Sequence, residues 1–355
     1  MNKAEKISSY QLFLLMAVSR ALSTLTFIPQ INENAGLIDY IAASVAAWLF
    51  MPVVFMPVIL LIKSNRTDSI FTLFPKAGKP LSIAMCILLL FMAVFTLSRL
   101  NLFISTVFFP EKDTTVLMII TLLAVCYCAS LSLEPVARAG TLIFVFLALS
   151  LAVITVSLID KLEFNYITPV MSGGISSVVK LVVSVTVRTV EPLFLILLLP
   201  VTNGNVKKGF IIWIAATGLA LSVITALLTL SLGESALYQL FPYHAMAQLA
   251  DLGVLERMDA LLTGVWIFSA FLRLCLILYL INDICQKTFK TANKVPFTAI
   301  SGVIILTAVL VSEKSLSYSG FIFSLPLRAC LFAIFVILLP TAAVIKIKLK
   351  AKRVK

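Results

Sequence analysis

The chain has 355 residues, of which 28 are basic and 16 acidic, so its formal net charge is +12. It is 61% hydrophobic and only 12% charged, whereas a soluble domain is about half apolar and about a quarter charged. Apolar runs of about 20 residues, long enough to cross a bilayer, recur along the whole sequence. The composition predicts an integral membrane protein that contacts the lipid bilayer. It excludes soluble enzymes, nucleic-acid-binding modules and secreted disulfide scaffolds.

Ten apolar segments follow one another in chain order, and each is predicted to be a membrane-spanning helix. The turn between the fourth and fifth segments is indicated by Glu134, Pro135 and Arg138. The segments belong to a single polytopic membrane domain, 1–355, which ends in a basic tail at 346–355. The predicted spans cover residues 10–31, 38–62, 81–107, 115–134, 135–159, 176–200, 209–232, 257–282, 296–312 and 318–345.

The distribution of basic residues predicts the orientation of the chain. Basic residues gather in cytoplasmic loops of membrane proteins. If the N terminus is cytoplasmic, the cytoplasmic segments hold 18 basic residues, against only Lys112, Lys161, Arg257 and Lys314 on the other side. Both termini are therefore predicted to be cytoplasmic.

Ten spans divide into five plus five, and five is odd, so the second set would cross the membrane in the inverted direction. We expect an all-α fold with a first five-helix repeat at 10–159 and a second, inverted repeat at 176–345. Transporters of this LeuT-like architecture hold their substrate near the midplane, where the first helix of each repeat is interrupted. The first and sixth helices are therefore predicted to be interrupted.

Charged side chains within the spans are the first candidates for a functional site. Each costs about 2.5 to 3.5 kcal/mol on insertion scales, so it needs a partner or a wet cavity. Glu191 lies near the middle of the sixth span, where it could bind a substrate ammonium or carry a proton. Its partner is either Arg20, from the first span, or Arg188, three residues earlier on the same helix. The basic residues within spans are Arg20, Arg99, Lys180, Arg188, Arg273 and Arg328, and the charge-pair or coupling candidates are Arg20, Arg99, Arg188, Glu191 and Arg273.

Two polar stretches, 19–24 and 186–192, are the predicted helix interruptions. Pro192 removes a backbone donor and opposes a straight helix. Amides and carbonyls freed at such breaks bind carboxylates and cations, although the serine and threonine hydroxyls could instead bond to the preceding turn. Asn101 and Trp266 could line a cavity, and packing is their alternative role. The ligand-binding candidates are Ala21, Leu22, Ser23, Thr24, Asn101, Thr189, Val190, Glu191 and Trp266.

Motifs of catalysis do not occur in this sequence. It has no aspartate-rich motif, paired metal-binding histidines, phosphate-binding glycine loop or nucleophile elbow. We predict neither an enzyme nor a bound metal or cofactor.

Two sets of short stretches are typical of one protein family. The first is Ile7-Ser8-Ser9-Tyr10-Gln11-Leu12-Phe13, at the start of the first span. The second and more specific is Phe241-Pro242, followed by Leu255-Glu256-Arg257-Met258-Asp259-Ala260-Leu261 and then Trp266, Phe271, Arg273 and Tyr279. In these stretches the chain resembles the B subunits of spore germinant receptors, also called endospore germination permeases.

This resemblance implies the fold of the amino acid, polyamine and organocation transporter superfamily. It implies a subunit of the spore inner membrane or bacterial cell membrane that recognises a small nutrient, often an amino acid. Such a subunit triggers germination together with an A subunit and a C lipoprotein. By position, the ligand pocket would include Ala21–Thr24 and Thr189–Glu191. The family usually has glycine beside the acid and in the first helix, whereas Val190 and Ala21–Ser23 stand here. A proton- or cation-coupled amino acid transporter is the alternative function.

Overall fold

The computed structural model describes residues 6–25, 37–64, 69–74, 77–110, 112–167, 174–250, 259–291, 293–314 and 324–353. This part of the chain is helical apart from two short strands, β1 (Ile7–Ser8) and β2 (Thr202–Asn203). The strands pair in parallel, with Ile7 opposite Thr202 and Ser8 opposite Asn203.

The helices of the first half are α1 (Ser9–Leu25), α2 (Leu37–Val54), α3 (Met56–Ser64), α4 (Ile70–Leu73), α5 (Gly78–Val107), α6 (Thr115–Ser130) and α7 (Leu133–Leu158). Short helices η1 (Ile159–Lys161) and η2 (Phe164–Ile167) follow. The second half has α8 (Gly174–Val187), α9 (Pro192–Leu198), η3 (Leu199–Val201), α10 (Val206–Leu232), η4 (Gly233–Tyr238), α11 (Pro242–Leu249), α12 (Asp259–Phe289) and α13 (Val295–Lys314). It ends with α15 (Leu325–Phe332), the π-helical turn η5 (Ala333–Leu338) and α16 (Leu339–Arg353).

Eight helical segments in the described part of the chain are long and apolar enough to cross a membrane. A ninth apolar helix, α6, is shorter, and α1 has 17 residues before the described range ends at Leu25. The ten-span count and the inverted repeat stay predictions. The eight segments are Ile38–Ser64, Gly78–Val107, Leu133–Lys161, Gly174–Val201, Val206–Tyr238, Asp259–Phe289, Val295–Glu313 and Leu325–Lys350.

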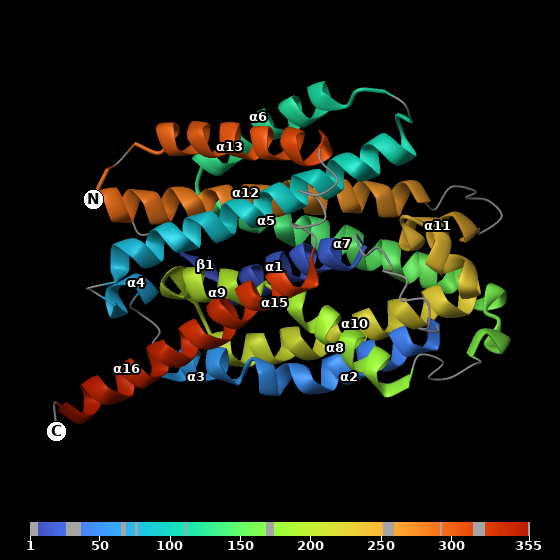
Figure 1. Ribbon diagram of the computed structural model, residues 1–355, viewed down its shortest axis with the longest axis horizontal. Coiled ribbons are helices and arrows are strands. Elements are labelled where there is room, and N and C mark those ends of the chain that lie inside the picture. The colour runs from blue at the N-terminus through green and yellow to red at the C-terminus, as the bar shows by residue number, and fades with distance from the viewer. Residues whose placement is uncertain are drawn as a thin grey trace.

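Helix α12 lies at the centre of the bundle, where it packs against α5, α6, α7, α1 and α13 (Figure 1). It is the most buried of the candidate spans, as expected for a helix that is apolar around most of its circumference. β1 and the C-terminal end of α16 lie at one end of the molecule, and α11 lies at the other.

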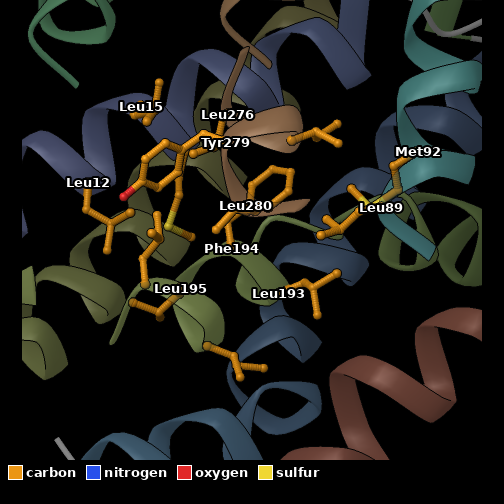
Figure 2. Packing of buried hydrophobic residues seen from close by; sticks show 14 of the residues in the cluster. Leu12, Leu15, Leu89, Met92, Leu193, Phe194, Leu195, Leu276, Tyr279 and Leu280 are labelled. Carbon is orange, nitrogen blue, oxygen red and sulfur yellow. The ribbon is translucent and has the colours of Figure 1, made fainter. Parts of the chain in front are cut away.

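Side chains of α1, α5, α9 and α12 meet in the largest buried cluster (Figure 2). Phe194 of α9 is fully buried there, together with Leu15 of α1, Leu89 of α5 and Leu280 of α12. The short helix α9 is thus held in place by the core. This positions the polar residues that precede it.

The predicted interruption of the first helix is wrong over residues 19–24, because α1 is continuous through Leu25. The Ser23 hydroxyl donates to the Ser19 carbonyl at 3.4 Å, and the Thr24 hydroxyl donates to the Arg20 carbonyl at 3.2 Å. The polar side chains therefore bond to the preceding turn, the alternative left open by the sequence. The end of the predicted span, 26–31, lies outside the described residues.

The turn between the fourth and fifth predicted spans comes earlier than expected. Helix α6 ends at Ser130 and α7 begins at Leu133. Pro135 lies inside the first turn of α7, where a missing backbone donor costs no helical hydrogen bond. Proline there marks the helix start rather than the turn itself.

Candidate functional site

The sixth predicted span is interrupted, with α8 ending at Val187 and α9 beginning at Pro192. Proline suits the first position of a helix because its fixed φ is helical and its missing N–H would have no partner there. Before the break, the Thr189 amide donates to the Thr186 carbonyl at 3.0 Å. Residues 188–191 thus leave the helical path at the centre of the span.

Glu191 lies at the end of this break and is fully buried. Its Oε1 accepts hydrogen bonds from the hydroxyls of Ser19, at 3.3 Å, and Ser23, at 3.4 Å. Arg273 of α12 forms an ion pair with the same oxygen, at 3.3 Å. Within the described residues, Glu191 Oε2 has no hydrogen-bond partner. One carboxylate therefore connects α1, the break and α12.

Arg273 also binds α1 directly. Its Nη1 donates to the Ser19 carbonyl at 3.1 Å and to the Ser23 hydroxyl. A buried ion pair is stable only when further hydrogen bonds satisfy its remaining polar atoms. Ser19 and Ser23, one turn apart on α1, supply such bonds.

The ion pair of Glu191 is with Arg273 rather than with Arg20 or Arg188, and Arg20 lies near enough for its charge to interact with that of Glu191. Arg188 cannot use the i, i+3 geometry of a helix, since the helix is interrupted between the two residues. Arg20 is buried and lines a second cavity together with Ser23 and Thr24. The partner of Glu191, Arg273, comes from the central helix α12 instead.

Beside the break lies a cavity of about 150 Å³, which we call the arginine cavity. Its walls come mainly from α5, the break, α12, α15 and η5, with one residue each from α1, α8 and α9. Arg99, Arg188, Arg273 and Arg328 line it, together with Ser23 and a set of apolar side chains. The guanidinium groups of Arg99 and Arg328 both lie over the Phe95 ring, at 5.5 and 5.8 Å from its centre.

A smaller cavity of about 40 Å³ lies between α1, α2, α8, α10 and α11. Arg20, Tyr40, Arg188 and Tyr243 line it, so we call it the tyrosine cavity. It shares Ser23 and Arg188 with the arginine cavity. The tyrosine cavity holds a few water molecules at most, so the arginine cavity is the better ligand site.

The structure brings some of the predicted site residues together and separates others. Ser23, Val190, Arg99, Arg188 and Arg273 line the arginine cavity, and Arg20, Ser23, Thr24 and Arg188 line the tyrosine cavity. Thr189 is buried, and its hydroxyl donates to the Val185 carbonyl at 3.3 Å. Ala21 faces an apolar groove between α1, α7 and α10, and Leu22 packs in a buried apolar cluster.

Asn101 and Trp266 do not line either cavity. The Asn101 amide donates to Glu313 Oε1 at 2.6 Å, and its oxygen accepts from the Thr114 hydroxyl at 2.7 Å. Trp266 is fully buried, with its ring 3.6 Å from that of Phe103, centre to centre. Both residues pack between helices, which is the alternative role that the sequence leaves open for them.

Sequence reasoning did not assign Arg328 and Phe95 to the site. Arg328 stands out in the sequence as a charge in an apolar run. Its contact with Phe95 cannot be predicted from the sequence, because Phe95 lies in α5, more than 200 residues earlier. Phe95 gave no signal among the many phenylalanines of the spans. Among the described residues, no group of three histidine, cysteine or acidic side chains is placed to hold a metal ion.

Comparison with known proteins supports a family assignment. A family model described as "Spore germination protein" matches residues 6–316, which is most of the chain. The chain is also similar to "Spore germination protein XB" of Bacillus anthracis. The two are 22% identical over 321 residues, which cover 87% of this chain and 89% of that protein.

Proposed function

The chain belongs to the spore germination protein family, and we propose that it is a membrane subunit of a spore germinant receptor. In this role it recognises a small nutrient such as an amino acid and triggers germination together with partner subunits. The partners are a germinant receptor A subunit and a C lipoprotein. The protein resides in the spore inner membrane with both termini in the cytoplasm, and its ten spans form an inverted five-plus-five repeat.

The observation that carries this proposal is the interrupted helix next to a cavity. Glu191, at the break, joins α1 to α12 through Ser19, Ser23 and Arg273. Ser23 and Arg273 also line the arginine cavity. A ligand that fills the cavity thus touches two of the residues that hold the break together. Binding can thereby favour one packing of the helices over another.

The free energy needed to shift the packing of the helices determines how well the ligand must be enclosed. To move a two-state equilibrium from 1:99 to 99:1, a ligand must favour one state by about 5.5 kcal/mol. A small molecule achieves this only if most of its surface is enclosed. The arginine cavity is lined by residues of α1, α5, α8, α9, α12, α15, η5 and the break, which surround part of a bound ligand.

A germination assay tests the proposal. Spores that lack this chain are complemented with the wild type or with Glu191→Gln, and release of spore-core solutes is followed after addition of an amino acid mixture. We expect the wild type to restore the response and Glu191→Gln to abolish it. The matched control is Asp283→Asn, which removes a partly exposed acid of α12 that pairs with Lys287. If wild-type and deletion spores respond alike to every nutrient tested, the receptor role is wrong.

A proton- or cation-coupled amino acid transporter is the second candidate, favoured by the interrupted helix at the centre of a span. Uptake of a labelled amino acid mixture into vesicles containing the purified protein separates the two. Accumulation driven by a proton or sodium gradient supports transport. Binding without accumulation supports the receptor.

A further inference from the structure

The arginine cavity carries an excess of positive charge. Arg99 of α5, Arg188 of the break, Arg273 of α12 and Arg328 of α15 all line it. No acidic side chain is among the described residues of its lining. Charged groups at this depth are costly and mark functional sites by default. Guanidinium groups bind carboxylates and phosphates through paired hydrogen bonds.

The positive groups are concentrated at one wall of the cavity. Arg99 and Arg328 both lie over the ring of Phe95. Arg188 is close enough to Arg328 and Arg99 for their charges to repel. An anion bound between these groups reduces that repulsion, whereas a cation increases it. The electrostatics of the cavity therefore select for negative charge.

Glu191 offsets the charge of Arg273, with which it forms an ion pair, but is not itself among the residues that line the cavity. It is fully buried and does not line the cavity, and its Oε1 is used by Arg273 and two serines. Among the described residues that line the cavity, no carboxylate is placed to bind the ammonium group of a zwitterionic amino acid. A ligand without an ammonium group suits the cavity better.

The remaining wall is apolar and sets the size of the ligand. Phe91, Phe95, Phe332 and Phe335 lie among the lining residues. A cavity of about 150 Å³ is comparable to an engineered apolar cavity that binds benzene. The space therefore fits an apolar group of about this size with its charged head toward the arginines.

From these observations we infer that the arginine cavity binds a small organic monoanion, a carboxylate attached to an apolar group about as large as a benzene ring. This inference rests on the proposed function, because it names the chemical class of the nutrient. It replaces a zwitterionic amino acid by a carboxylate that lacks the ammonium group.

Equilibrium binding of radiolabelled benzoate to the full chain in nanodiscs tests the inference, with empty nanodiscs subtracted. The competitors are benzamide, which has the same shape without the charge, benzylamine, which carries the opposite charge, and inorganic phosphate, which lacks the apolar group. We expect benzoate to bind at least ten-fold more tightly than each of them. Equal competition by benzamide or benzylamine overturns the role of the arginines, and equal competition by phosphate overturns the role of the apolar wall.

Two variants locate the site. Arg99→Gln and Arg328→Gln should each weaken benzoate binding at least ten-fold. The matched control is Arg138→Gln, which removes an exposed arginine that pairs with Glu134 on the surface of α7, and it should bind like the wild type. Unchanged binding in both cavity variants overturns the assignment. The comparison of benzoate with benzamide needs the wild-type protein alone. It therefore tests the preference for an anion even if a variant does not fold.

Failure of the inference and failure of the proposed function give different results. If germination requires this chain but benzoate and benzamide bind equally, the receptor role stands and the anion site is wrong. If benzoate binds selectively but deletion spores germinate normally with every nutrient, the anion site stands and the receptor role is wrong.

Discussion

Arg273 Nη1 of α12 lies 3.3 Å from Glu191 Oε1, and the two side chains are only 6% and 0% exposed. The residues are 82 positions apart in the chain, yet they form the central contact between the interrupted sixth span and the most buried helix. Removing one partner of a buried pair costs more than the pair contributes, because it leaves an uncompensated charge.

Glu191→Gln and Arg273→Gln should each lower the free energy of unfolding by about 3 kcal/mol. The double variant should lose clearly less than the sum, because the second change removes the charge that the first left unpaired. Denaturant titration of the purified protein measures all three. Asp283→Asn and Lys287→Gln provide the control cycle on a more exposed pair, which should show coupling of less than about 1 kcal/mol. Additive losses at Glu191 and Arg273 would show that the two side chains act independently.

Gly218→Ala should destabilise the protein, since α10 approaches α2 closely at this glycine. A Cβ there would lie 2.0 Å from Cδ1 of the Trp48 ring, and overpacking of this kind costs about 1 to 3 kcal/mol. Gly264→Ala is the matched control, because a Cβ at this position in α12 meets nothing within 4 Å. It should stabilise by up to about 1 kcal/mol, through helix propensity. Thermal unfolding measures both, and equal melting temperatures would contradict the close approach.

Cys86 and Cys285 should form a disulfide when the protein is treated with copper phenanthroline. Their sulfur atoms, on α5 and α12, are 3.9 Å apart, and a small movement of the side chains brings them to the disulfide distance of about 2.05 Å. Mass spectrometry of digested protein should find the linked peptides, and dithiothreitol should remove the link. Cys86→Ser should abolish it. Absence of the link in the wild type would mean that α5 and α12 do not meet as described.

His244→Gln should reduce the loss of stability on acidification. Burial lowers the pKa of His244 below its ordinary value near 6.5, against the opposite effect of the Asp259 charge. The unfolded chain therefore takes up this proton at a higher pH than the folded protein does. Stability should fall as the pH drops below about 6.5.

This is the single histidine of the chain, so no other imidazole contributes. The melting temperatures of the wild type and the variant are measured between pH 7.5 and 5. The slopes of melting temperature against pH are compared, rather than the absolute melting temperatures. Parallel slopes for wild type and variant would rule out titration of His244 as the cause.

Local sequence predicts the spans and the break in the sixth helix, but it does not predict which residues meet. Pro192 marks the break because proline disrupts a helix wherever it stands in the chain. The pairing of Arg273 with Glu191 depends on how α12 is rotated against α1 and on where these two helices cross. Nothing within either helix encodes that relationship.

The interruption predicted in the first helix fails for a similar reason. Serine and threonine permit a break but also stabilise a continuous helix through bonds to the preceding turn, as Ser23 and Thr24 do here. Which of the two occurs depends on the neighbours. Glu191 and Arg273 bind the same face of α1 and hold Ser19 and Ser23 in helical positions.

The parallel pairing of β1 with β2 fastens the start of α1 to the chain that follows α9. The hydrogen bonds of Glu191 with Ser19 and Ser23 fasten the two again, roughly 20 Å farther along α1 at 1.5 Å per residue. Two attachments so far apart fix the direction of α9 relative to α1. Helix α8 instead packs on α2. Residues 188–191 therefore join a short helix that is tied to α1 with a helix that packs on α2, so the two parts of this one span are anchored to different neighbours.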